Sequence, residues 1–440
     1  MIDLKETIIQ FGEGNFLRGF ADYFLHILNK NGAYDGKAVI IQPRIGGKVA
    51  GLNAQECKYN LYLRGIEKDE VKSAHYYIES ISRCIDPYKD FDDYIELALN
   101  PDFRFIVSNT TEAGIEFNPD CKFTDKPCVS FPGKLTQLLY KRFEAGLKGF
   151  ILLPCELIDN NGEALKDCVL KYAELWNLGG NFVKWIEEEN TFANTLVDRI
   201  VTGYPDDDTA KLHPEDKYLD TAELFHLWVI EGDFEEELPL KKAGFNVVWT
   251  EDVKPYKKTK VRILNGAHTS MVLGAIIGGL ETVGECMEDE TVSAFLNKCM
   301  TTEILPTIGE TESNVQFASH VFDRFKNPFI KHQLRAIALN SISKFSVRVL
   351  PTILEYKEKF GAYPKGLTTS LAFLIYFYKN DTTDDSMAEA MEYIKTRSIN
   401  DILSNKDIWQ EDLSPLSELV IEAYKIIEEY GAKEAMKWTL

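Results

Sequence analysis

The sequence lacks long apolar runs, paired cysteines and any excess of positive charge. None of its hydrophobic stretches approaches the roughly 18 residues that a transmembrane helix needs. The first residues, 1–6, lead directly into an apolar strand and resemble neither a signal nor a transit peptide. The eight cysteines include no Cys-x-x-Cys pair, and no histidine stands at zinc-finger spacing. We therefore expect a cytoplasmic protein with reduced thiols, no membrane association and no metal site.

Acidic residues outnumber basic ones, 69 against 49, which gives a formal net charge of −20. Such a surface repels phosphate backbones, so we expect no nucleic-acid partner. The hydrophobic content of 45% and the charged content of 27% are ordinary for a globular protein. At 440 residues the chain exceeds a typical single core, and we expect two or three domains. Composition indicates neither a substrate nor an oligomeric state.

The order of predicted elements changes along the chain. Short β-rich runs alternate with helical stretches as far as about residue 155, with strands predicted over 7–11, 38–41, 103–108 and 149–153 and helices over 15–30, 91–99 and 134–145. This alternation predicts an α/β domain with a doubly wound parallel sheet. Helical periodicity dominates beyond about residue 250, over 263–280, 330–342, 366–378, 386–397 and 416–437. We predict an α/β domain over 1–250 and a mostly helical domain over 251–440, with a loop at 380–385 that caps the following helix.

A glycine-containing turn follows the first predicted strand. Gly12 and Gly14 permit a tight turn and the close approach of a pyrophosphate, and the helix that begins at Asn15 offers free N–H groups and the positive end of its dipole. Leu17 stands where the usual fingerprint has a third glycine, so the pattern alone is a weak signal. Its strand–turn–helix context nevertheless predicts the dinucleotide site of a Rossmann-type domain, with a plain structural turn as the alternative.

Two arginines bear on the nature of the cofactor. Arg18 lies in the first turn of a helix, where a cation opposes the macrodipole, and it should have an anionic partner. That partner could be a cofactor phosphate or a nearby acidic side chain. The second strand runs into Gln42-Pro43-Arg44, without the acidic residue that binds the adenosine ribose in the simplest NAD sites. Arg44 could face a 2′-phosphate or stack on adenine, so NAD is expected while NADP stays open.

Lys260, Asn265 and His268 lie where the helical domain begins. On a helix Asn265 and His268 share a face, and Lys260 precedes them by about a turn and a half. Reduction of a ketone needs a proton donor for the developing alkoxide and groups that stabilise its charge. A partly buried lysine can be that acid, an asparagine amide is a neutral donor, and a histidine can orient either. Each residue alone is more often structural, but together they indicate a catalytic centre.

The segment 260–268 has the pattern Lys-x-Arg-x-Leu-Asn-x-x-His, which resembles the active-site signature of the polyol-specific long-chain dehydrogenases, the mannitol dehydrogenase family. The turn at 12–18, with glycines at 12 and 14, Phe16 and Arg18, is similar to that family's cofactor turn. Segments 192–200 and 223–231 fit as well, and the helical remainder fits the second domain of the family. The resemblance implies a metal-independent, nicotinamide-dependent oxidoreductase. Lys260 would be the general acid in reduction, Asn265 would polarise the carbonyl, and His268 would orient the group.

The segment 107–115 is similar to the branch of this family that acts on keto-uronates, and its Asn109 and Thr110 are expected at the cofactor. The resemblance therefore implies a small sugar acid as substrate. Asn161, just before Gly162, would be a second donor to the carbonyl oxygen, with an ordinary turn as the alternative. Asp198 would contact the substrate or an active-site cation, or would serve as a structural ion-pair partner.

The carboxylate of a uronate needs a cationic receptor, for which a bidentate arginine or a lysine is suited. Arg262, Lys344 and Arg348 are the candidates, and their i,i+4 spacing places the last two on one helix face. A solvated helix face is the alternative for that pair. Other functions remain open at this point: an enzyme of the same family acting on fructuronate/mannonate or mannitol/fructose, or a nicotinamide-binding protein without catalysis. The complete set of Lys260, Asn265 and His268 argues against the last.

Overall fold

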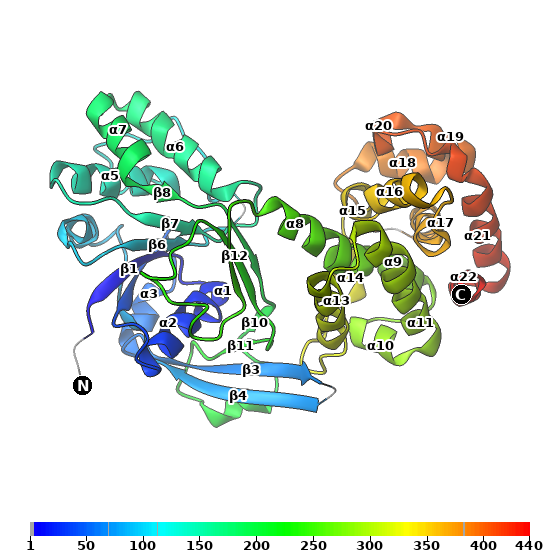
Figure 1. The fold of residues 1–440 in the computed structure, drawn as a ribbon, viewed down its shortest axis with the longest axis horizontal. Helices are drawn as coiled ribbons and strands as arrows, with labels where there is room; N and C mark the ends of the chain where they lie inside the picture. Colours follow the sequence, from blue (N-terminus) through cyan, green and yellow to red (C-terminus); the bar gives the residue numbers. More distant parts are fainter. Residues whose placement is uncertain (1–3, 69, 112, 382) are drawn as a thin grey trace. The chain divides into compact units, whose positions relative to one another are not determined.

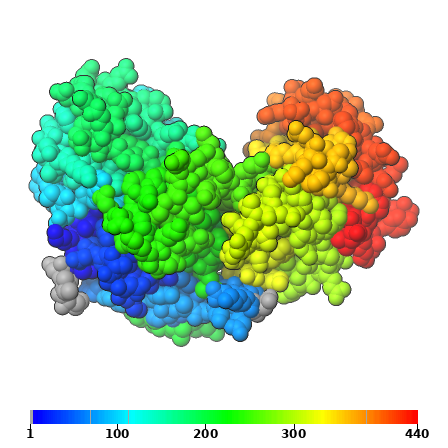
Figure 2. Space-filling view, viewed as in Figure 1, coloured from blue at the N-terminus to red at the C-terminus, as the bar shows by residue number. Residues whose placement is uncertain are grey.

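The computed structural model describes residues 4–440 apart from 69, 112 and 382. Residues 1–3 of the amino terminus, Glu112 of the segment 107–115 and Thr382 of the predicted loop 380–385 therefore lie outside the described residues. The chain divides into two compact units, one of residues 1–64 and 72–254 and the other of residues 65–71 and 255–440. In Figure 2 residues 255–440 run from yellow-green to red.

A parallel sheet of six strands forms the centre of the first unit (Figure 1). The strand order is β5-β2-β1-β6-β7-β8, and every neighbouring pair is parallel. The strands are β1 Glu6–Phe11, β2 Lys37–Ile41, β5 Ile81–Ile85, β6 Phe105–Ser108, β7 Ile151–Pro154 and β8 Thr191–Phe192. Counted within the sheet this is the order 3-2-1-4-5-6 of the doubly wound dinucleotide-binding fold. The predicted α/β fold of the amino-terminal part is confirmed.

The strands of this sheet are buried on both faces because helices cover both. Ile8 of β1 belongs to one hydrophobic cluster, together with Phe20 and Phe24. The next residue, Ile9, points to the opposite cluster, which includes Leu135 of α5. Two-sided burial explains the continuous Val- and Ile-rich runs from which the strands were predicted. The helices of this unit are α1 Asn15–Arg18, α2 Ala21–Lys30, α3 Val49–Ala54, α4 Phe91–Glu96, η1 Leu97–Leu99, α5 Phe131–Glu144, α6 Asn161–Leu175, α7 Gly180–Glu189 and η2 Asp208–Leu212.

The single helix predicted over 15–30 is wrong, because the structure divides it into α1 and α2. At the break between α1 and α2, two backbone carbonyls accept hydrogen bonds from side chains. The Tyr59 hydroxyl donates to the carbonyl of Arg18 at 2.8 Å, and Arg199 Nη1 donates to that of Gly19 at 3.0 Å. A Cβ on Gly19 would lie 3.0 Å from Val201, so glycine also permits close packing of that segment. Tertiary contacts thus override a periodic helical pattern.

Two smaller sheets, most of whose residues belong to the first unit, were not predicted. One has the order β10-β11-β3-β4 and the other the order β13-β12-β9. Their strands are β3 Tyr59–Glu67, β4 Glu70–Ile78, β9 Thr195–Asp198, β10 Val201–Gly203, β11 Asp220–Ala222, β12 Leu227–Glu231 and β13 Val247–Thr250. The residues of β4 are mostly exposed, and β10 and β11 have only three residues each. None of these three strands therefore shows a marked apolar pattern. β11 forms a strand by pairing with β3, which lies far from it in the sequence.

The second unit is mostly helical, as predicted (Figure 1). Its centre is α9, of which every residue from Gly266 to Ala275 is buried, packed against α17, which is buried from Gly366 to Ile375. The elements are α8 Lys254–Lys260, η3 Val261–Asn265, α9 Gly266–Ile277, α10 Val283–Glu288, α11 Glu290–Lys298, η4 Cys299–Ile304, α12 Leu305–Ile308, α13 Glu312–Phe325, α14 Leu334–Ala338, α15 Ser341–Arg348, α16 Leu350–Phe360, α17 Lys365–Asn380, α18 Ala388–Thr396, α19 Ile399–Ser404, α20 Lys406–Trp409, η5 Ser414–Leu416, α21 Ser417–Tyr430 and α22 Ala432–Thr439. No helix of the described residues is long and apolar enough to cross a membrane.

Three predictions of detail in this unit are wrong. The helix expected over 330–342 is replaced by α14 and α15, because Asn340 between them has a left-handed backbone, φ +58°. Gly431, φ +91°, likewise divides the segment 416–437 into α21 and α22. In the loop 380–385, Asp385 accepts the N–H of Ile342 at 3.2 Å, so its capping contact reaches the first turn of α15. The helix that follows the loop, α18, has Met387 at its N-cap.

Candidate active site

The glycine turn lies at the carboxyl edge of the six-stranded sheet, between β1 and α1. Gly12 has φ +123°, and a Cβ there would lie 2.7 Å from the carbonyl oxygen of Asn109, so only glycine fits. Its N–H donates to Ile41 of β2 at 3.1 Å, which holds the turn against the neighbouring strand. At Gly14, in contrast, nothing lies within 4 Å of an added Cβ. The turn is therefore packed on one side and open beside Gly14, which suits the close approach of a pyrophosphate to the backbone.

Asn109 and Thr110 follow β6 at the same edge of the sheet. Asn109 Nδ2 donates to the carbonyl of Cys155 at 2.8 Å, while the N–H and hydroxyl of Thr110 donate to Glu156 at 2.9 and 3.0 Å. Glu156 also accepts from Ser108 at 3.0 Å, and its burial raises the pKa of its carboxyl. Sequence reasoning missed Glu156. Its carboxylate fixes the loop that carries both predicted cofactor residues beside the glycine turn.

Arg44 is exposed in the segment after β2. This segment is attached to the glycine turn by Glu13, a residue that sequence reasoning did not single out. Glu13 Oε1 accepts the N–H of Lys48 at 3.1 Å, and a Cβ on Gly47 would lie 2.3 Å from the same oxygen. The glycine turn and the segment after β2 are thus held together by one carboxylate.

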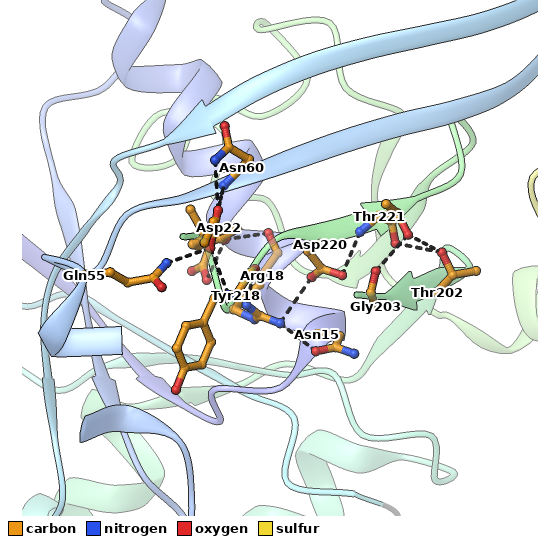
Figure 3. A network of polar contacts seen from close by, with 12 residues as sticks. Asn15, Arg18, Asp22, Gln55, Asn60, Thr202, Gly203, Tyr218, Asp220 and Thr221 are labelled. Carbon is orange, nitrogen blue, oxygen red and sulfur yellow. Dashed lines mark hydrogen bonds and ion pairs between the residues drawn. The ribbon is translucent and has the colours of Figure 1, made fainter. Parts of the chain in front are cut away.

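Arg18 is buried and has its anionic partner within the protein (Figure 3). Its guanidinium donates to the carbonyl of Tyr218 and to Oδ1 of Asn15, both at 2.6 Å, and lies 3.8 Å from Asp220. Of the two partners considered from sequence, the structure contains the acidic side chain. Asn15 is likewise engaged through its side-chain oxygen, and Phe16 stacks on Phe20 at 5.0 Å. Arg18 therefore holds α1 against β11, while Asn15 bonds to Arg18 and Phe16 packs on Phe20.

Asp22 lies in the same buried region and gives the unit a titratable group. Burial raises its pKa to about 7, although hydrogen bonds from Gln10 and Tyr59 and the charge of Arg18 oppose the shift. An unfolded aspartate has a pKa of about 3.9. Between about pH 4 and pH 7 the folded state therefore retains a proton that the unfolded state has released. The free energy of unfolding should therefore fall as the pH rises from about 4 to about 7 and level off above.

We expect Asp22→Asn to reduce this fall, because the amide cannot ionise. The difference in free energy of unfolding between the variant and the parent should shift in favour of the variant by roughly 2–4 kcal/mol from pH 5 to pH 8. Urea titration at the two pH values measures this shift. Asp220, whose pKa burial also raises to about 7, keeps part of the pH dependence in the variant. An unchanged slope would show that Asp22 is already ionised in the folded protein at pH 5.

Asn161 begins α6 and is almost fully buried. Its Nδ2 donates to the carbonyls of Pro154, Glu156 and Thr195 at 3.0, 3.1 and 3.2 Å. Its Oδ1 accepts the N–H groups of Thr195 and Gly162 at 2.8 and 3.0 Å. Both ends of the amide are therefore used to join β7, α6 and β9. This geometry favours the turn interpretation of Asn161 over a donor held ready for a substrate.

Removal of the Asn161 side chain should accordingly affect stability first. Asn161→Ala leaves the buried N–H of Thr195 and several carbonyls without their partner, and we expect a loss of about 2–4 kcal/mol in free energy of unfolding. Thermal unfolding and turnover per folded molecule should be measured together. A variant of parental stability with a lost turnover would restore the interpretation of Asn161 as a donor to the substrate.

Asp198 ends β9 and is buried, paired in register with Leu227 of β12. It belongs to the first unit, as does Glu231 at the end of β12, whose carboxylate accepts from Asn194 at 2.8 Å and from the N–H of Val253 at 3.1 Å. Glu231 is thereby tied to the segment that leads into α8. A contact between Asp198 and a substrate stays a prediction.

Lys260, Asn265 and His268 lie on one nearly continuous helical segment, formed by α8, η3 and α9. The middle part, η3, is a π-helical turn, in which the N–H of Gly266 donates to the carbonyl of Val261, five residues back. In a regular α-helix residues five apart point about 140° away from each other. A π-turn accommodates one additional residue, so 260, 265 and 268 take the relation that i, i+4 and i+7 have in a regular helix. The three side chains therefore share one face.

The surroundings of these side chains differ. Lys260 and Asn265 are half-buried, and among the described residues nothing bonds to the side-chain amide of Asn265. His268 is buried and stacks on Phe325, with centroids 4.1 Å apart and planes at 12°, while His332 contacts its edge at 5.3 Å. The histidine ring is thus held in place by aromatic packing. The amide of Asn265 has donors to offer, which is the condition for polarising a carbonyl.

The three candidate receptors for a carboxylate belong to the second unit, close to this segment. Arg262, in η3, pairs with Glu355 at 2.9 Å and donates to Thr352 at 2.7 Å. Lys344 and Arg348 are both half-buried on α15, as their spacing predicted, and burial lowers the pKa of each. Nζ of Lys344 donates to the carbonyl of Ile337 at 2.8 Å.

The strand order and the glycine turn define a dinucleotide-binding unit, and two family models cover almost the whole chain. The model described as the mannitol dehydrogenase Rossmann domain matches residues 6–242, and that of the mannitol dehydrogenase C-terminal domain matches residues 252–430. The chain is also 43% identical to the altronate oxidoreductase of Yersinia enterocolitica, over 98% of this chain and 96% of that protein. The protein therefore belongs to the mannitol dehydrogenase family, a family of oxidoreductases that act on CH–OH groups.

Solved structures show the same fold. A D-sorbitol dehydrogenase in substrate-free form matches with a TM-score of 0.87 and 25% identity, over 98% of this chain and 95% of that one. The mannitol 2-dehydrogenase of Pseudomonas fluorescens, solved as a ternary complex with NAD and D-mannitol, matches with a TM-score of 0.72 and 22% identity, over 99% and 94%. Among the described residues of the present protein, no group of three or more His, Cys, Asp or Glu side chains could hold a metal ion. All eight cysteines are buried and free of disulfides.

Proposed function

We propose that the protein is an altronate oxidoreductase, which reversibly reduces D-tagaturonate to D-altronate with NADH in hexuronate catabolism. The observation that carries this proposal is the alignment of Lys260, Asn265 and His268 on one face of α8–η3–α9, in a chain 43% identical to an altronate oxidoreductase over nearly its full length. The net charge of −20 disfavours a nucleic-acid partner. We also propose that the boundary between the α/β domain and the helical domain lies at residues 250–251.

The first unit would hold NAD. Its glycine turn has room beside Gly14 for a pyrophosphate, and Asn109 and Thr110 stand at the same edge of the sheet. Arg44 would contact the adenosine end. The bound nicotinamide supplies the hydride for the carbonyl carbon. Support for NAD also comes from the mannitol 2-dehydrogenase, whose structure contains it.

The second unit would supply the proton and the charge stabilisation. Lys260 donates a proton to the oxygen of the carbonyl as it becomes an alkoxide, and it withdraws the proton from the hydroxyl in the oxidation direction. The Asn265 amide donates a hydrogen bond to the same oxygen. His268, held by Phe325, keeps its ring in one orientation beside them. No step of this scheme needs a metal ion.

The direct test is oxidation of NADH, followed by absorbance, on mixing the protein with D-tagaturonate, D-fructuronate and D-fructose in parallel. We expect D-tagaturonate to have the highest kcat/KM, NADPH to be a poorer donor than NADH, and EDTA to leave the rate unchanged. A preference for fructuronate or fructose would assign a different substrate within the family. Absence of turnover with all three, while NADH still binds, would identify a cofactor-binding protein without this activity.

A further inference from the structure

Two of the three cations near the proposed catalytic segment already have partners in the protein. Arg262 forms an ion pair with Glu355, which also pairs with Lys258 at 3.1 Å. Lys344 donates to a backbone carbonyl. Both side chains therefore already contribute to the local structure. Among the described residues, Arg348 is different, because no acceptor contacts its guanidinium.

The position of Arg348 brings it close to Asn265. Arg348 is the last residue of α15, and its carbonyl oxygen lies 3.1 Å from where a Cβ of Gly266 would be. Gly266 directly follows Asn265, the residue proposed to polarise the substrate carbonyl. The absence of a side chain at 266 thus allows the end of α15 to pack against the start of α9. Asn265 lies within the reach of one arginine side chain from the backbone of Arg348.

A half-buried guanidinium without an anion is unfavourable, since it loses hydration and gains no partner. Burial is the cause of its lowered pKa, and no carboxylate opposes that shift. The planar fork of an arginine matches a carboxylate with two parallel hydrogen bonds. A keto-uronate carries its ketone near one end of a six-carbon chain and its carboxylate at the other. One substrate therefore needs a donor at the ketone and a cation some distance away.

We propose that Arg348 binds the substrate carboxylate and determines the selectivity of the enzyme for sugar acids over neutral sugars. This inference rests on the proposed function and names the residue that would separate a keto-uronate reductase from a mannitol-type enzyme. Lys344 and Arg262 have a different part: each fixes the local structure through the contact it already makes. Arg348 is a binding residue and takes no part in proton transfer.

The experiment compares Arg348→Met with the parent on an acid and on its neutral counterpart, D-tagaturonate and D-fructose. We expect kcat/KM for D-tagaturonate to fall about 10- to 100-fold, mainly through KM, because a charged hydrogen-bonded pair is lost. The kcat/KM for D-fructose should stay within threefold. Arg348→Lys, which keeps the charge and loses the fork, should lie between the two. Arg397→Met, which removes an exposed arginine of the same unit, is the matched control and should change neither value.

A second measurement does not depend on turnover. D-Altronate should raise the melting temperature of the parent and of Arg397→Met, but not of Arg348→Met, while D-mannitol should have little effect on any of them. Equal losses for acid and neutral substrate, or an unchanged ratio, would overturn the assignment of Arg348 and leave the proposed function intact. If the parent reduces no keto-uronate, the proposed function fails; Arg348 is then judged by the melting temperatures alone, and a parental response to D-altronate in Arg348→Met overturns it.

Discussion

Lys260→Ala is expected to lower kcat for D-tagaturonate reduction by about 10²- to 10⁴-fold, the range typical for loss of a positioned general acid. The affinity for NADH should change little, because the glycine turn and its flanking loops belong to the first unit and Lys260 to the second. Single-turnover kinetics with bound NADH would separate these two effects.

The matched control is Lys258→Ala. Lys258 lies on the same helix, α8, but is about half exposed and pairs with Glu355 at 3.1 Å. Lys258→Ala removes one cation from the same part of the chain. It should leave kcat within about twofold of the parent, since surface ion pairs contribute little. Normal turnover in Lys260→Ala would mean that another group transfers the proton.

Asn265→Ala should lose about 2.7–4 kcal/mol of transition-state stabilisation, which corresponds to about 10²- to 10³-fold in kcat. The reason is that no described residue bonds to the amide, so its N–H groups are available to donate to the developing negative charge. Stability should change little, in contrast to Asn161→Ala, where six hydrogen bonds within the protein are lost. A kcat within twofold of the parent would remove Asn265 from the chemistry.

These two asparagines show what the sequence can and cannot reveal. Both stand in segments that resemble family motifs, and both were predicted to donate to a carbonyl oxygen. The hydrogen bonds of Asn161 depend on its neighbours Thr195 and Glu156. The amide of Asn265 has no such neighbours among the described residues. Those neighbours are brought together by the fold, so a motif alone cannot distinguish a structural amide from an available one.

Four strands of the parallel sheet, β1, β2, β6 and β7, were predictable because they are buried on both faces and read as short apolar runs, as in Val39-Ile40-Ile41. The other two, β5 and β8, were not predicted, because β5 has Ser82 and Arg83 at its centre and β8 has only two residues. The glycine turn was predictable because Gly12 needs a backbone conformation that other residues rarely adopt. The partner of Arg18 was not. Asp220 is 202 positions away in the chain, on a strand of three residues that has no sequence signal of its own.

The π-turn at Val261–Asn265 was also beyond the sequence. The helical periodicity there is compatible with an ordinary α-helix, in which Lys260 and Asn265 would point away from each other. Only the additional residue in the turn places both on the face that carries His268. The spacing Lys-x-x-x-x-Asn-x-x-His thus makes physical sense for a π-turn, a kind of irregularity often found at functional sites.

The most direct test of the account is the structure of the protein in complex with NAD and D-altronate. The account predicts that Nζ of Lys260 lies about 2.6–3.2 Å from the hydroxyl oxygen that is oxidised, with the amide of Asn265 in hydrogen-bonding contact with the same oxygen. A complex in which this hydroxyl faces the nicotinamide while Nζ of Lys260 lies in solvent, more than about twice that distance away, would contradict it.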